Sequence, residues 1–155
     1  MPLTALIEQY LAGPDTLRRS VKGMTREQLT ARPVEGKWST LEVVAHIADF
    51  EPILADRMMR VISHERPLLL VADENLFAAA LNYQGREVEE ELAVVEATRK
   101  KTARVLRGLR PEAANRMGVH SFKGLVSLEA VLTSAVHHIP HHVAFIEAKR
   151  KALGV

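Results

Sequence analysis

The chain has 155 residues, of which 47% are hydrophobic and 26% charged, and its formal net charge is +2. A globular chain of this length buries roughly 70% of its unfolded surface, so we expect a single domain, residues 1–155, that folds without disulfides. The lack of cysteine excludes a thiolate nucleophile and a Cys-type zinc site, and it fits a cytoplasmic protein. Interspersed charges and the absence of a run of ~20 apolar residues argue against nucleic-acid binding and a membrane span.

Two stretches in the first half of the chain have the apolar spacing of a helix. The first covers residues 3–24, where Pro14 is expected to kink or restart the helix. The second begins at Ser39, whose hydroxyl forms a capping box with Glu42, and it closes before Pro67.

Two further helical stretches follow in the second half. The third carries its stripe over residues 88–109 and ends at Pro111, and the fourth runs from near Ser127 to near Gly154. Four amphipathic helices predict an all-α fold, a four-helix bundle. The connection between helices two and three, residues 66–85, is far longer than usual and has room for a short helix. Such a connection lets helices two and three run in the same direction.

Histidines are concentrated in one segment of the fourth helix. Four of the seven lie within residues 137–142, and they form two pairs at i, i+4 spacing, His137 with His141 and His138 with His142. Side chains at that spacing share a helix face with Cβ atoms about 5–6 Å apart. Either pair can therefore place two imidazoles on one divalent metal.

The apolar stripe of the fourth helix selects one pair. Steps of three and four residues from Val131 and Ala135 lead to His138 and His142, so we expect these two to face inward. The segment lacks the glutamate of an HExxH metalloprotease motif. An exposed polar patch, or an interface that responds to pH, is the alternative interpretation of the run.

A third ligand is needed, and His46 is the best candidate because it lies in an apolar stretch of the second helix. It follows the cap at Ser39 by about 10 Å along the helix, whereas His142 follows Ser127 by about 22 Å. The two reach a similar level only if helices two and four are antiparallel. The metal hypothesis therefore requires an up-down-down-up bundle, which is the topology that the long second connection permits.

These segments resemble a known family. Residues 36–51 (GKWSTLEVVAHIADFE) and residues 138–146 (HIPHHVAFI) are similar to the opening of helix two and the closing motif of the DinB-like (DinB/YfiT) superfamily. The resemblance extends over nearly the whole chain. It implies an up-down-down-up four-helix bundle with Ni²⁺ or Zn²⁺ held by three histidines, which by position are His46, His138 and His142.

The resemblance also implies a class of activity. Characterised members of the superfamily are thiol-dependent transferases and isomerases, in which the metal binds the sulfur of a small thiol such as bacillithiol, mycothiol or glutathione. Here Phe145 stands where many relatives have glutamine, which removes a polar group near the site. Our first hypothesis is a metal-dependent S-transferase that joins an external low-molecular-weight thiol to a small electrophilic substrate.

Several other residues are candidates for the pocket. Arg99 and Thr102 interrupt the third apolar stripe and can orient a ligand, but an Arg99 that snorkels to solvent and a Thr102 that bonds its own backbone are the simpler expectation. Asp49, one turn after His46, can support the metal ligands, and together with Glu51 it is the nearest acid in sequence for metal-dependent hydrolysis. Trp38 is expected to be a packing anchor rather than a substrate platform.

Hydrolysis is the second enzyme hypothesis. The third is non-enzymatic: a metal-binding or stress-induced interaction module, in which the helix faces bury against a second copy to form a homodimer.

Overall fold

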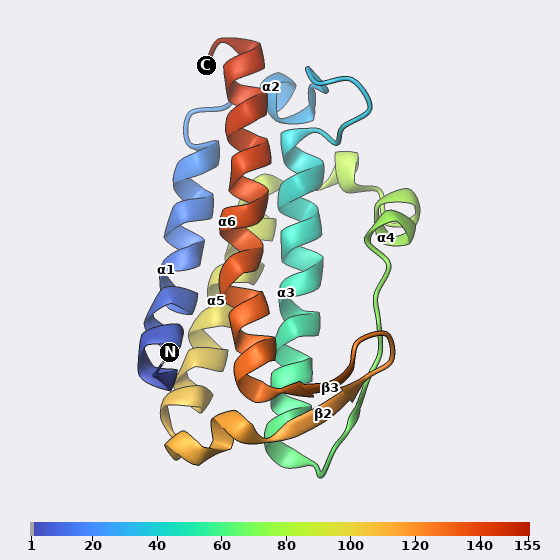
Figure 1. The fold of residues 1–155 in the computed structure, drawn as a ribbon. Helices are drawn as coiled ribbons and strands as arrows, with labels where there is room; N and C mark the ends of the chain where they lie inside the picture. Colours follow the sequence, from blue (N-terminus) through green and yellow to red (C-terminus); the bar gives the residue numbers. More distant parts are fainter. Residues whose placement is uncertain (1) are drawn as a thin grey trace.

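The computed structural model describes residues 2–155, and four long helices form its body (Figure 1). These helices are α1 (Leu3–Val21), α3 (Thr40–Ser63), α5 (Val88–Arg107) and α6 (Leu128–Leu153). Figure 1 shows α1 and α6 running in one direction and α3 and α5 in the other. The predicted up-down-down-up bundle is therefore confirmed, with α3 antiparallel to α6.

The helix boundaries follow the sequence signals closely. Ser39 caps α3 by accepting from the amide of Glu42, whose carboxylate in turn accepts from the Ser39 amide. Ser127 caps α6, and the helix ends at Gly154, which adopts the left-handed conformation that glycine tolerates best. Helix α1 continues through Pro14, so of the two outcomes expected there, a kink or a restart, the restart does not occur. The small helix α2 (Arg26–Thr30) was not predicted.

The long connection between α3 and α5 contains the expected short helix, α4 (Glu74–Ala80), followed by a 3-10 turn, η1 (Tyr83–Gly85). It also contains strand β1 (Leu68–Leu69), which no sequence pattern predicted. The connection after α5 carries η2 (Pro111–Asn115), β2 (Met117–His120) and β3 (Gly124–Ser127). Strands β1, β2 and β3 form a small sheet at the end of the bundle.

The sheet joins two connections that are far apart in sequence. Strand β1 pairs with β2 in parallel, and β2 pairs with β3 as an antiparallel hairpin. Gly118 permits the close approach, since a Cβ there would lie 2.9 Å from Cδ1 of Leu69 and from Cγ2 of Val61. The pairing ties the start of the long connection to the base of the bundle, so that its remainder rises along α3 to α4.

The core consists of two apolar clusters with a polar layer between them. One cluster includes Leu6, Met58 and Leu132, and the other includes Leu17, Ile47 and Ile146. Between them lies Arg99, which is completely buried, together with Glu51. Within residues 2–155, no helix combines the length and apolar character needed to cross a membrane.

Candidate metal centre

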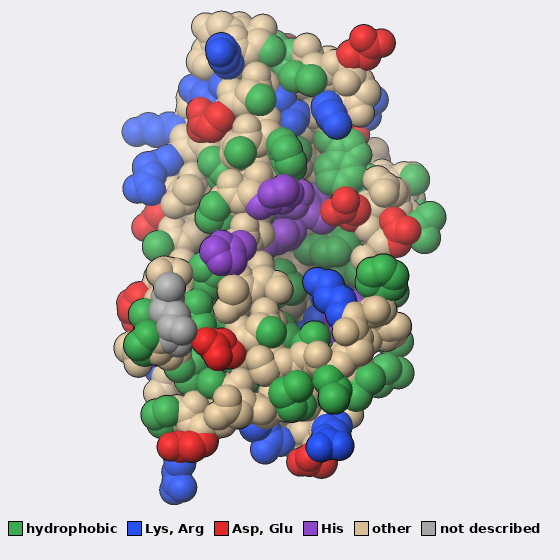
Figure 2. Space-filling view, in the orientation of Figure 1, with side chains coloured by type: hydrophobic (Ala, Val, Ile, Leu, Met, Phe, Trp, Pro, Cys, Tyr) green, Lys and Arg blue, Asp and Glu red, His purple; other side chains and the backbone are tan. Residues whose placement is uncertain are grey.

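Three histidines from two antiparallel helices meet near the middle of the bundle. Nε2 of His46 on α3 lies 3.1 Å from Nε2 of His138 and 3.1 Å from Nε2 of His142, both on α6. His46 and His142 are buried and His138 is half-buried. Figure 2 shows the histidine side chains gathered at the centre of one face of the molecule.

The arrangement suits a divalent cation. Two nitrogen ligands of a tetrahedral ion, each ~2.0–2.1 Å from it, lie about 3.3 Å apart. One ring nitrogen from each of the three histidines lies within 4.8 Å of those of the other two. Imidazole nitrogen is a good ligand for both nickel and zinc. The donor atoms and their spacing therefore fit the group that the sequence motif implies.

The protonation of the three rings also fits metal binding. Burial lowers the pKa of His46 to about 4, with Asp49 acting weakly in the opposite direction. Burial, followed by the neighbouring histidines, lowers the pKa of His138 and of His142 to about 3. At neutral pH all three are uncharged, which is the form that coordinates a metal.

The other two histidines of the run are placed differently. His137 and His141 are exposed on α6. The ring of His141 lies at the rim of the site, 5.0 Å from the ring of His142 and 5.0 Å from that of Phe145. Neither contributes to the cluster of converging ring nitrogens found in residues 2–155.

A cavity of about 740 Å³ opens beside the three histidines. Aromatic rings form much of its wall, since Trp38, Phe50 and Phe145 all line it. The ring of Phe50 is 4.4 Å from that of His46, and the ring of Trp38 is 5.4 Å from it. Trp38 thus borders the space for a ligand in addition to packing. Phe145 adds an apolar ring to the wall at the position where the family resemblance led us to expect a polar side chain.

An acid that sequence reasoning missed lies at the cavity. Oε2 of Glu74, the first residue of α4, is 3.7 Å from Nε2 of His46, and the side chain is 53% exposed. The sequence predicted a short helix here but gave no sign that it folds back over α3. Farther along the same connection, Arg86 donates to both carboxylate oxygens of Asp49 on α3 at 3.0–3.1 Å.

The remaining predicted pocket residues lie elsewhere. Asp49 pairs with Arg86, and Nδ1 of His46 has no hydrogen-bond partner. Arg99 does not reach solvent, contrary to the simpler expectation. It is completely buried in the core, where Nη1 and Nη2 donate to Glu51 and to two backbone carbonyls, and Nε has no partner among the described residues. Thr102 is buried in the same layer. None of Asp49, Arg99, Thr102 and Glu51 is among the residues that line the cavity.

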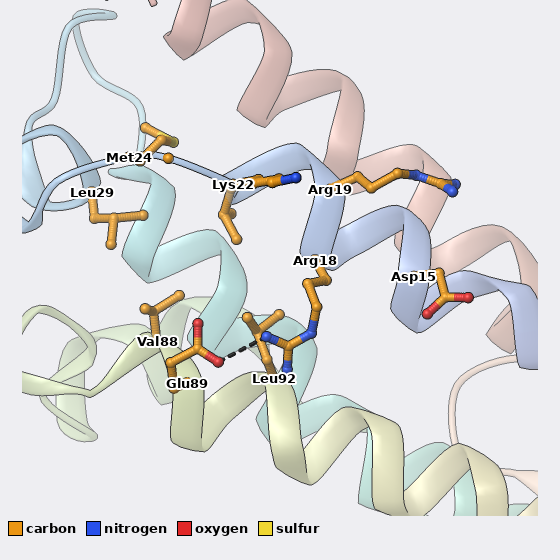
Figure 3. A pocket seen from close by; sticks show the side chains of 11 residues that line it. Asp15, Arg18, Arg19, Lys22, Met24, Leu29, Val88, Glu89 and Leu92 are labelled. Atoms are coloured by element: carbon orange, nitrogen blue, oxygen red, sulfur yellow. Dashed lines mark hydrogen bonds and ion pairs between the residues drawn. The ribbon is translucent and has the colours of Figure 1, made fainter.

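A second cavity, of about 540 Å³, lies between α1 and α5 (Figure 3). Its most central charged side chain, Arg18, points toward α5 and is neutralised there by Glu89 at 2.8 Å and Glu96 at 2.7 Å. Arg19 and Lys22 point away from it in Figure 3. This cavity therefore offers neither converging ligands nor an unpaired buried charge.

Comparison with known proteins places these features in a family. The model of the DinB superfamily matches residues 9–146. A protein of Oceanobacillus iheyensis, provisionally named a metal-dependent hydrolase, is 29% identical over 140 residues, which cover 89% of this chain and 81% of that protein. YfiT of Bacillus subtilis, named in the same way, is 26% identical over 142 residues, with coverage of 91% and 80%.

Solved structures agree with this assignment. The structure of Bacillus subtilis YfiT, described as having an unusual four-helix bundle topology, superimposes with a TM-score of 0.91 at 25% identity and covers 98% of this chain and 87% of that one. A mycothiol-dependent maleylpyruvate isomerase superimposes with a TM-score of 0.73 at 15% identity, with coverage of 93% and 60%, and shares the fold. The histidine triad and the metal-dependent relatives together point to a divalent metal.

Proposed function

The chain belongs to the DinB superfamily, and we propose that it is a divalent-metal-dependent enzyme that transfers a small thiol to an electrophile. The observation that carries this proposal is the convergence of three uncharged histidine nitrogens on the wall of a cavity of about 740 Å³. Three protein ligands leave coordination positions open, as catalytic rather than structural sites do. A cavity of this size has room for organic reactants as well as water.

His46, His138 and His142 would hold the ion, and nickel and zinc are the candidates because imidazole suits both. When bound, the ion supplies Lewis acidity that lowers the pKa of a thiol or a water molecule at the site. Oε2 of Glu74, 3.7 Å from Nε2 of His46, is placed to accept the proton that the nucleophile loses. The sulfur then forms a bond to the electrophilic carbon, and the leaving group departs with the electron pair.

The aromatic wall supports this reaction in two ways. Trp38, Phe50 and Phe145 offer apolar surface against which an organic electrophile can pack. The same rings reduce the access of water to the nucleophile, which favours transfer to the electrophile over hydrolysis. The use of this fold by a mycothiol-dependent isomerase is compatible with the proposal, although that likeness concerns the fold alone.

Metal-dependent hydrolysis is the second candidate, and Glu74 is the observation that favours it. An acid beside the histidines can serve as the general base for a water nucleophile. The relatives from Oceanobacillus iheyensis and Bacillus subtilis are provisionally named metal-dependent hydrolases.

Metal analysis of untagged protein, supplemented with Ni²⁺ or Zn²⁺ and then dialysed, tests the shared premise. We expect about one ion per chain, and less than about a tenth of an ion per chain would overturn both candidates. Turnover of a chloro-aromatic or epoxide substrate with and without an added thiol then separates them. Thiol-dependent turnover supports transfer, and equal turnover without thiol supports hydrolysis.

A carboxylate variant tests the role of Glu74. Glu74→Gln should lower turnover by about 10²–10⁴-fold, the usual contribution of a general base, while leaving the metal content unchanged. Glu65→Gln, which changes an exposed carboxylate away from the cavity lining, is the matched control. Full activity in Glu74→Gln would remove Glu74 from the mechanism.

A further inference from the structure

The cavity contains a buried cation that the proposed reaction does not use. Lys149 lies two turns after His142 on α6, lines the cavity, and is only 3% exposed. Its Nζ donates to the carbonyl of Phe145 at 3.1 Å and lies 5.9 Å from the centre of the Phe145 ring. An ammonium has three donors, so two are left for other partners.

Lys149 has no ion pair with an acid anywhere in residues 2–155. The acid with most influence on it, Glu42, is engaged elsewhere: its carboxylate accepts from Arg32 at 2.5 and 3.0 Å and from the amide of Ser39. The only other lysine along the cavity, Lys37, is exposed at its rim. Burial lowers the pKa of Lys149, because its ammonium loses contact with water.

Buried lysines are rare unless they are paired, because an ammonium loses its hydration on burial. A ligand that brings a negative charge into the cavity would supply the missing partner. The charges around the cavity favour one orientation for such a ligand, since Glu74 lies beside His46 whereas Lys149 and Lys37 line another part of the wall. The aromatic rings between these groups fit an organic molecule rather than an inorganic ion.

We propose that Lys149, assisted by Lys37, forms a subsite for the carboxylate of a small organic acid, which is therefore the substrate class of this cavity. The proposal rests on the proposed function in that it assigns a substrate to the same site. A substrate held there by its carboxylate keeps its apolar part against Trp38 and Phe145 and its reactive end toward the histidines.

The chain has one tryptophan, Trp38, and it lines this cavity. Tryptophan fluorescence therefore reports occupancy directly. The probes are benzoate and its neutral counterpart benzamide, titrated into protein stripped of metal with EDTA so that the carboxylate cannot bind an ion. We expect benzoate to bind about tenfold more tightly than benzamide, as a charge-assisted hydrogen bond implies.

Four variants test the origin of that preference. Lys149→Met and Lys149→Gln should abolish it, and the second keeps the test available if the first does not fold. Lys149→Arg should retain it, and Lys151→Met, which changes an exposed lysine on the same helix, is the matched control. Equal binding of the two probes by the wild-type protein, or a preference that survives Lys149→Met, would overturn the proposal.

The metal-free experiment keeps this inference separate from the proposed function. Equal binding of benzoate and benzamide by the wild-type protein, together with normal metal uptake and thiol-dependent turnover, would reject the subsite alone. A Lys149-dependent preference in a protein that takes up no metal would uphold the subsite and reject the enzyme proposal.

Discussion

Two groups of polar side chains lie inside this bundle, and they differ in what their polar atoms face: partners within the protein in one group, and a cavity in the other. In the first group, Nε of Arg99 is the one buried side-chain atom without a partner among the described residues. In the layer between the apolar clusters, Arg99 donates to Glu51 Oε2 at 2.9 Å, and Tyr10 donates to Glu51 Oε1 at 2.6 Å. In the histidine cluster, Nδ1 of His46, His138 and His142 all lack a partner within the described residues, and their Nε2 atoms converge.

The first group compensates for an irregularity of the fold. Pro14 cannot donate to the carbonyl of Tyr10, so a buried acceptor would be left free inside α1. Nη1 of Arg99 donates to that carbonyl at 2.8 Å, and Nη2 donates to the carbonyl of Ala135 at 2.7 Å. The guanidinium therefore supplies a donor to the acceptor that Pro14 leaves free. The contrast indicates that the buried ion pair serves the structure, and that the converging histidine nitrogens serve a ligand.

The largest expected effect comes from breaking the ion pair. Arg99→Met leaves the carboxylate of Glu51 buried without its cation and should lower the free energy of unfolding by about 3–5 kcal/mol. Urea unfolding of the metal-free protein measures this. The double variant Arg99→Met with Glu51→Leu should be less destabilised than the single variant, because it leaves no unpaired buried charge. A single variant as stable as the wild type would refute a structural role for the pair.

The corresponding change in the histidine cluster should act on metal binding. His142→Ala removes one of the three converging nitrogens and should weaken Ni²⁺ or Zn²⁺ binding more than about 100-fold, since even outer hydrogen-bond partners are worth 10–100-fold. A competition titration with a chromophoric chelator measures this. His137→Ala changes an exposed histidine on the same helix and should bind metal as the wild type does. Normal affinity in the His142 variant would show that the wrong pair was chosen.

A smaller effect tests the packing around Arg99. Gly13 on α1 leaves room for this side chain, because a Cβ at that position would collide with its guanidinium and lie 3.1 Å from Cδ1 of Ile139. Gly13→Ala should therefore destabilise the protein by about 1–3 kcal/mol, although the same change in an open helix stabilises it by roughly 1 kcal/mol. Thermal unfolding gives the sign, and a stabilised variant would contradict the packing described here.

The sequence predicted the fold well wherever the signals are local. The capping residues Ser39 and Ser127 fixed the starts of α3 and α6, and the requirement that His46 and His142 lie at one level gave the antiparallel arrangement. The small sheet was missed because it depends on a distant partner, and the restart that Pro14 left open does not occur. Strand β1 pairs with a strand about fifty residues later, and the carbonyl that Pro14 leaves free accepts from Arg99 on another helix.

The same reason explains what was missed around the site. The spacing of His138 and His142 is local, so their shared face could be read directly. Glu74 reaches the cavity only because the long connection folds back along α3, and Lys149 is buried only because neighbouring elements cover it. Arg99 interrupts the apolar stripe of its helix, and such an interruption indicates either a contact with a ligand or a buried partner. The sequence alone did not identify Glu51 as that partner.

The smallest expected effect concerns Asp49, whose position one turn after His46 suggested support for the metal ligands. In the structure its carboxylate is held by Arg86 at 3.0 Å, and Nδ1 of His46 has no partner. Asp49→Asn should therefore change metal affinity by less than the roughly tenfold that marks the loss of an outer partner. Isothermal titration with Zn²⁺ measures it. A loss of tenfold or more would mean that Asp49 leaves Arg86 for His46 when metal binds, so that the histidine cluster gains an acidic partner as Arg99 has one in Glu51.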